Sequence, residues 1–161
     1  MNLLRLLLSV FLPAAAMSVE FKSPVVDLAL DKNWIQAPGD DESQVLFRSD
    51  KFQTQVTLSW ILLQGVTQEK WKEIGERTLQ HRKTAEKNIG GEGVIIEGES
   101  VELLADKCIV KYHAHDVDHR CRFYGIVKGN VILMFYTETL GKDDALNARL
   151  HNEAIAALKV H

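Results

Sequence analysis

Three closely spaced strands decide the fold: Cys108–His115 (CIVKYHAH), 120–127 (RCRFYGIV) and 131–138 (VILMFYTE). Each is rich in β-branched and aromatic residues, which favour strands. The short segments between them, 116–119 (DVDH) and 128–130 (KGN), have the composition of tight turns. Strands joined by tight turns pair antiparallel, so the sequence predicts an antiparallel meander.

The first of these turns determines how residues of the first two strands pair. This pairing in turn decides whether the two cysteines can form a disulfide. With the turn centred on 117–118, Cys121 lies opposite Ala114, and Cys108 lies further along the ladder. The spacing of residues in a strand then separates the two cysteines by about 20 Å. This is too far for a disulfide, so we predict two free and mostly buried thiols.

In the flanking segments, the spacing of apolar residues predicts a further strand and two helices. Polar and apolar residues alternate over 52–62, which is typical of a half-buried antiparallel strand. A helical period follows over 67–87, with Thr67 as the expected cap, and a second amphipathic helix is expected over 143–159. Further strands are expected at 25–30 and 44–48, and 94–97 with 100–104 are expected to form one strand with a bulge at Gly98. A solvated loop is expected at 36–43.

This order of elements predicts the fold class α+β, an antiparallel β-sheet with two amphipathic helices packed on it. An early strand followed by a turn and a tryptophan (28–34, LALDKNW), a hairpin, one long helix, a meander and a closing helix resemble the PsbP-like superfamily. That superfamily includes DcrB-like bacterial envelope proteins and effector-associated chaperones of type VI secretion. The resemblance covers 19–160 and implies a PsbP/DcrB-like sandwich that binds other proteins, with no shared catalytic residues. The chain departs from the DcrB-like pattern because it has no lipobox cysteine.

Composition and the N-terminus indicate an exported single domain. The chain has 161 residues, 46% of them hydrophobic, and a net charge of −3. It lacks the excess of basic residues that is typical of nucleic-acid-binding proteins, so we expect no nucleic-acid partner. Residues 1–18 have the basic start, short apolar run and small residues of a signal peptide, with cleavage expected after Ala16 or Ser18. The sequence therefore predicts a single α+β domain over 19–161, located in the periplasm or secreted, without stable membrane insertion after cleavage.

A histidine-rich segment around the first turn is the candidate metal site. His113, His115, Asp118 and His119 could together hold Zn²⁺ or Cu²⁺. The same register places Arg122 opposite His113 and Arg120 opposite His115, and guanidinium groups there would repel a cation. The alternative is a solvated polar face on that strand.

Aromatic and basic residues of the meander are candidates for binding a protein partner: Tyr124, Tyr136, Arg120 and Arg122. The strand 131–138 is apolar on both sides, so each side needs a cover. Either two elements of the chain cover it, or a partner protein covers one side.

An acid, a base and a binding pocket cannot be assembled from these residues, and Cys121 is expected to be a structural thiol. We therefore expect a non-enzymatic, exported protein-binding module of the bacterial envelope. Its specific role would be that of an immunity protein or a chaperone-like accessory protein, with a toxin or secreted effector as its partner. The alternative is a periplasmic metal-binding protein that uses the turn region at His113 and His115.

Overall fold

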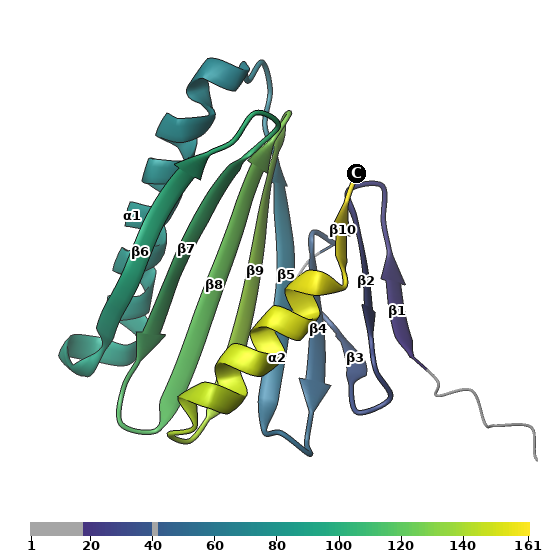
Figure 1. Cartoon of the computed structure of the whole chain (residues 1–161), viewed down its shortest axis with the longest axis vertical. Coiled ribbons are helices and arrows are strands. Elements are labelled where there is room, and N and C mark those ends of the chain that lie inside the picture. Colours follow the sequence, from purple (N-terminus) through teal and green to yellow (C-terminus); the bar gives the residue numbers. More distant parts are fainter. Residues whose placement is uncertain (1–17, 40–41) are drawn as a thin grey trace, which may run out of the picture.

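The computed structural model describes residues 18–39 and 42–161, so most of the expected signal peptide lies outside the described residues. The described chain is an α+β fold with two antiparallel sheets and two α-helices (Figure 1). The larger sheet has seven strands in the order β3-β4-β5-β9-β8-β7-β6, and the smaller has three in the order β1-β2-β10. This confirms the predicted fold class.

The larger sheet is built from β3 (Ile35–Pro38), β4 (Gln44–Ser49), β5 (Thr54–Leu62), β6 (Ile95–Leu103), β7 (Cys108–His115), β8 (His119–Lys128) and β9 (Val131–Leu140). The smaller is built from β1 (Val19–Lys22), β2 (Val26–Leu30) and β10 (Leu158–Val160). The α-helices are α1 (Trp71–Gly90) and α2 (Asp144–Ala156), and single 3-10 turns, η1 (Gln68–Lys70) and η2 (Gly91–Gly93), flank α1.

The central meander has the predicted register. In the ladder between β7 and β8, Ala114 pairs with Cys121, and Cys108 pairs with Val127 at the far end. Both cysteines are free and buried, as expected. The bulge in β6 is also confirmed, because the register with β7 shifts between Glu97 and Ser100, around Gly98 in the left-handed region.

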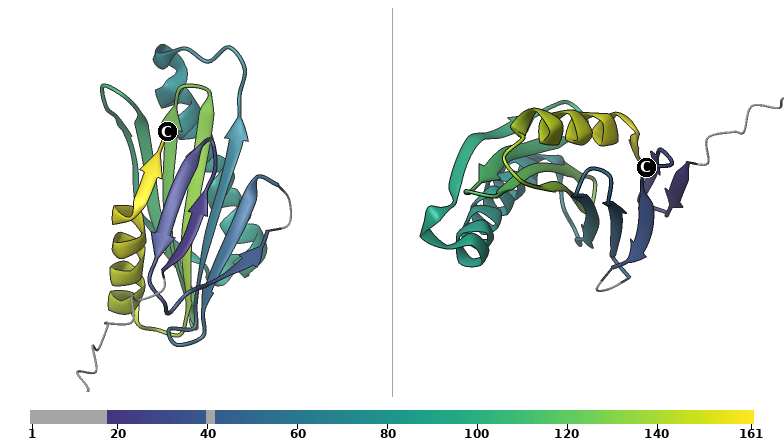
Figure 2. Two further views of the ribbon diagram at one scale, coloured as in Figure 1. Left: turned by 90° about the vertical axis from the view of Figure 1, so that its right-hand side faces the viewer. Right: turned by 90° about the horizontal axis from the view of Figure 1, so that it is seen from below.

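The two helices lie on opposite sides of the larger sheet, which curves around the side that carries α1 (Figure 2). Helix α1 contacts β6, β7 and β8, while α2 contacts β8, β9 and β2. Strand β9 is therefore covered on both sides by the chain itself, with Tyr136 in the core next to α1 and Phe135 in the core next to α2. A partner protein is not needed as a cover for β9.

Three local expectations were wrong. The segment 36–43, expected as a loop, contributes to the edge strand β3, which pairs with β4. The closing helix ends at Ala156 rather than near 159, because Leu158–Val160 pairs with β2 and completes the smaller sheet. Thr67 makes no side-chain capping hydrogen bond, and α1 begins only after the turn η1.

Gly75 brings α1 close to the sheet, which yields a testable prediction. A Cβ atom at this position would lie 2.9 Å from Sγ of Cys108 and 3.1 Å from Cγ1 of Val101. We expect Gly75→Ala to lower the free energy of unfolding by about 1–2 kcal/mol in a denaturant titration, because overpacking outweighs the better helix propensity of alanine. Thr84→Ala, at an exposed position of α1, is the control. A Gly75→Ala variant more stable than the wild type would contradict this packing.

Candidate functional site

The expected metal ligands lie on different faces of the larger sheet. His113 and His115 pair with Arg122 and Arg120, as predicted, and this row of residues faces α2. His119 shares the opposite face with Cys121, since side chains alternate along β8. The four expected ligands therefore do not converge.

Their actual partners are carboxylates and backbone groups. His113 Nε2 lies 3.1 Å from Glu97 Oε2, and His119 Nε2 lies 4.0 Å from Glu138 Oε1. Asp118 donates its backbone N–H to the side chain of Asp116 within the turn. Among the described residues there is no group of three or more His, Cys, Asp or Glu that could hold a metal ion.

The residues expected to bind a partner are mostly committed to internal contacts. Tyr136 is only 8% exposed, and the guanidinium of Arg82 stacks over its ring at 4.6 Å, so the expectation for Tyr136 was wrong. Arg122 Nη2 donates to both carboxylate oxygens of Asp144 at 2.8 and 2.7 Å. Arg120 donates to the backbone oxygens of the preceding turn. Tyr124 is half-buried beside the core that α2 covers.

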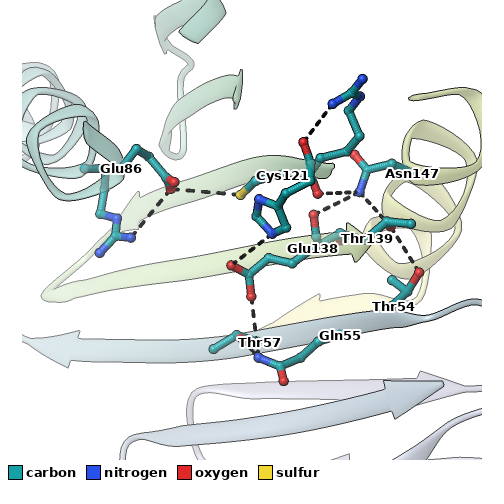
Figure 3. A network of polar contacts seen from close by, with 12 residues as sticks. Thr54, Gln55, Thr57, Glu86, Cys121, Glu138, Thr139 and Asn147 are labelled. Atoms are coloured by element: carbon teal, nitrogen blue, oxygen red, sulfur yellow. Dashed lines mark hydrogen bonds and ion pairs between the residues drawn. The ribbon is translucent and has the colours of Figure 1, made fainter. Parts of the chain in front are cut away.

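A buried polar cluster connects α1 to the sheet (Figure 3). Glu86 Oε1 accepts a hydrogen bond from the hydroxyl of Tyr112 at 2.7 Å and a weak one from the thiol of Cys121 at 3.9 Å. Arg82 Nη2 lies 3.8 Å from the same oxygen. Burial, followed by the charge of Glu86, raises the pKa of the Cys121 thiol well above its ordinary value. Cys121 is thus held in the protonated form, unlike a nucleophilic cysteine.

Glu138 lies at the edge of this cluster and faces a cleft. Gln55 Nε2 donates to Glu138 Oε2 at 3.4 Å (Figure 3). His119 Nε2 lies 4.0 Å from the other carboxylate oxygen, Oε1. Burial raises the pKa of Glu138, and the charge of Glu86 adds to the rise, whereas the charges of His119 and Arg82 oppose it. Sequence reasoning missed Glu138, although its strand position opposite Cys121 could have identified it.

The cleft lies where the β4–β5 hairpin meets the end of β9, and it has a volume of about 570 Å³. Its wall combines charged, polar and apolar side chains: Arg48, Ser49, Asp50, Gln53, Thr54, Gln55, His119, Glu138 and Leu140. Gln53 has a positive φ of 48°, which is unusual for a residue other than glycine. Leu140 is 65% exposed at the rim. A volume and lining of this kind suit recognition of a polar group next to an apolar one.

Next to the cleft, one part of the sheet on the α1 side has no helix over it within the described chain (Figure 2). We call this surface the open face. Because directly paired residues point to the same side, the register assigns it Ile35, Ala37, Leu46, Arg48, Gln55, Thr57, Ser59 and Ile61. Ile35 is 60% exposed and Ile61 is 46% exposed. The sequence does not reveal the open face, because its composition over 36–43 predicts a loop where the structure has the edge strand β3.

On the opposite side, buried polar groups anchor α2. Asn147 Nδ2 donates to the Thr137 carbonyl and to Thr139 Oγ1, both at 3.0 Å, and Thr139 in turn bonds Thr54 (Figure 3). His151 Nδ1 lies 2.9 Å from Thr137 Oγ1. Burial lowers the pKa of His151 to about 3, and the charges of Arg122 and Lys111 add to this effect. The spacing of four residues between Asn147 and His151 is the sequence signal for this face of α2, but both residues are polar and lie outside the pattern of apolar residues that predicts the helix.

Comparison with solved structures identifies the fold. The solution structure of cyanobacterial PsbP (CyanoP) from Synechocystis sp. PCC 6803 matches with a TM-score of 0.62, over 91% of this chain and 94% of that one, at 12% sequence identity. The chain has a PsbP-like fold. The crystal structure of a protein from Bacteroides thetaiotaomicron VPI-5482 matches with a TM-score of 0.52 at 14% sequence identity. This match covers 88% of this chain and 48% of that one.

These likenesses concern the fold alone. No protein-family model matches the chain, and no curated protein sequence matches it. The expected resemblance to the PsbP-like superfamily is confirmed at the level of the fold, whereas the DcrB-like assignment stays a prediction. The role therefore has to be argued from this chain's own surfaces, since one fold carries many functions.

Proposed function

We propose that this PsbP-like domain is an exported, non-enzymatic protein-binding module whose partner docks on the open face. The observation that carries this proposal is that Ile35 and Ile61 remain exposed on a sheet surface that α1 leaves uncovered. Ile35 and Ile61 lie at two ends of the open face, and Ala37, Leu46 and Thr57 form the row between them. An exposed apolar surface rimmed by polar residues marks an interaction site. Leu140, at the rim of the adjoining cleft, is a further exposed apolar side chain.

The polar residues beside the open face would supply specificity. Arg48, Gln55 and Glu138 lie in one row across β4, β5 and β9. All three line the cleft, and Arg48 and Gln55 also belong to the open face. Interfaces of this kind combine an apolar centre with a polar rim. A partner segment with an apolar side chain next to a polar group would fit this arrangement.

The proposed export rests on the N-terminal sequence. The first described strand, β1, begins at Val19, directly after the expected cleavage sites, so removal of the leader would leave both sheets complete. No helix in the described ranges is long and apolar enough to cross a membrane. Within the envelope, the partner would be a toxin neutralised by this chain or a secreted effector that it accompanies.

Two neighbouring residues on β5 provide the test. Ile61 points to the open face, and Leu62, 68% exposed, points to the other side of the same strand. We expect Ile61→Asp to weaken capture of the partner from an envelope extract at least tenfold, since a charge would be buried against an apolar surface, while Leu62→Asp leaves it unchanged. Circular dichroism of both variants checks folding. Equal capture by the wild type and a folded Ile61→Asp variant would contradict the proposed surface.

A further inference from the structure

A second cleft lies on the opposite side of the sheet, between β7, β8 and α2, with a volume of about 370 Å³. Its lining combines basic residues and histidines with three aromatic residues, one amide and one aliphatic residue: Lys111, His113, Arg122, Tyr112, Phe123, Tyr124, His151, Asn152 and Ile155, with Gly98 at the bulge. This cleft is separate from the open face, because the sheet lies between them (Figure 2).

Basic groups of this cleft are not fully compensated. Lys111 makes no ion pair among the residues that the structure describes, and its Nζ lies 5.6 Å from the centre of the Tyr124 ring. Arg122 is neutralised by Asp144, but its Nε is buried without a hydrogen-bond partner. The charge of Lys111 therefore remains uncompensated, beside the guanidinium of Arg122, whose buried Nε has no hydrogen-bond partner among the described residues.

The register places Lys111 and Arg122 at neighbouring positions on one face of the sheet. Lys111 pairs with Tyr124, and Arg122 is the diagonal neighbour of Lys111 on the same face. Diagonal neighbours of this kind are about 7–8 Å apart, which long side chains can bridge through one anion. Both charges act on His151 in the wall, where they add to the effect of burial and lower its pKa. The cleft wall thus holds a neutral imidazole close to the charges of Lys111 and Arg122.

We propose that this cleft binds a small organic monocarboxylate, with its carboxylate between Lys111 and Arg122 and its apolar body against Tyr124 and Ile155. One uncompensated lysine matches a single negative charge better than a phosphate dianion. The neighbouring ring and aliphatic side chain match an apolar body. The Asn152 amide adds a donor for the second carboxylate oxygen.

The test is a titration of the ¹⁵N-labelled protein with benzoate, followed by amide chemical shifts. We expect saturable shifts at Lys111, Tyr124 and Asn152, and no saturable shifts with neutral benzamide or with inorganic phosphate. Lys111→Gln, at an exposed position, should weaken benzoate binding about tenfold, because a charge-assisted hydrogen bond is lost. Lys72→Gln removes the same charge from α1 on the other side and should leave binding unchanged.

Three results would overturn the proposal. The first is the absence of saturable benzoate shifts at these amides. The second is equal weakening by Lys111→Gln and Lys72→Gln, which would indicate attraction by net charge alone. The third is tighter binding of phosphate than of benzoate, which would assign the cleft to a different class of anion.

Discussion

Replacing Phe123 by alanine should lower the free energy of unfolding by about 3–5 kcal/mol. Phe123 is 1% exposed at the centre of the core beneath α1. Its ring centre lies 5.0 Å from that of Tyr112 and 4.9 Å from that of Tyr136, so it joins β7, β8 and β9 through one aromatic row. The smaller side chain would lose both contacts and leave a cavity. Denaturant unfolding at neutral pH measures the change.

A double-mutant cycle with Gly125 tests the position of the Phe123 ring directly. A Cβ atom at Gly125 would lie 2.9 Å from Cζ of Phe123, so the ring occupies the space that the glycine leaves. Gly125→Ala should destabilise the wild type, but it should be neutral or stabilising in the Phe123→Ala background, where that contact is absent. The same cost in both backgrounds would contradict the placement of the Phe123 ring over Gly125.

Acidification from pH 7 to pH 4 should remove about 3 kcal/mol of stability through His151 alone. Burial, with the charges of Arg122 and Lys111, lowers the pKa of this imidazole to about 3 in the folded chain, against an ordinary value of 6.5. Between these values the unfolded chain binds a proton that the folded chain does not. Stability is therefore retained above pH 6.5 and is lost as the pH falls towards 3.

The control for this prediction is His151→Gln, which keeps a polar group near Thr137 but cannot bind a proton. The variant will be less stable at pH 7, because it loses the ring that packs against Phe135 at 5.8 Å. Between pH 7 and pH 4, however, it should lose about 3 kcal/mol less than the wild type, since both share the remaining titrating groups. An identical loss in the two proteins would show that His151 is not buried as a neutral base.

The meander could be predicted from the sequence because its information is local. Turn residues at 117–118 and alternation along 108–115 fixed a register that the structure confirms, together with the free cysteines. The smaller sheet could not be predicted in this way. Leu158–Val160 forms a strand only because β2, far away in the sequence, offers an edge for pairing. Strands this short carry no periodicity of their own.

The candidate site could be predicted less well than the meander, for a different reason. The predicted register already placed His119 on the opposite face from His113, because odd positions of β7 pair with even positions of β8. Grouping the histidines by their closeness in sequence overlooked this consequence. The cleft at Glu138 and the open face depend on where α1 stops covering the sheet, which no local pattern in the sequence specifies.

The measurement that tests the central claim most directly is photo-crosslinking in the envelope of the source cell. A benzophenone amino acid would replace Ile61 in one variant and Leu62 in another, which places the same probe on opposite sides of β5. The proposed function predicts one discrete crosslinked partner from position 61 and none from position 62. Crosslinking from position 62 alone, or no product from position 61, would contradict docking on the open face.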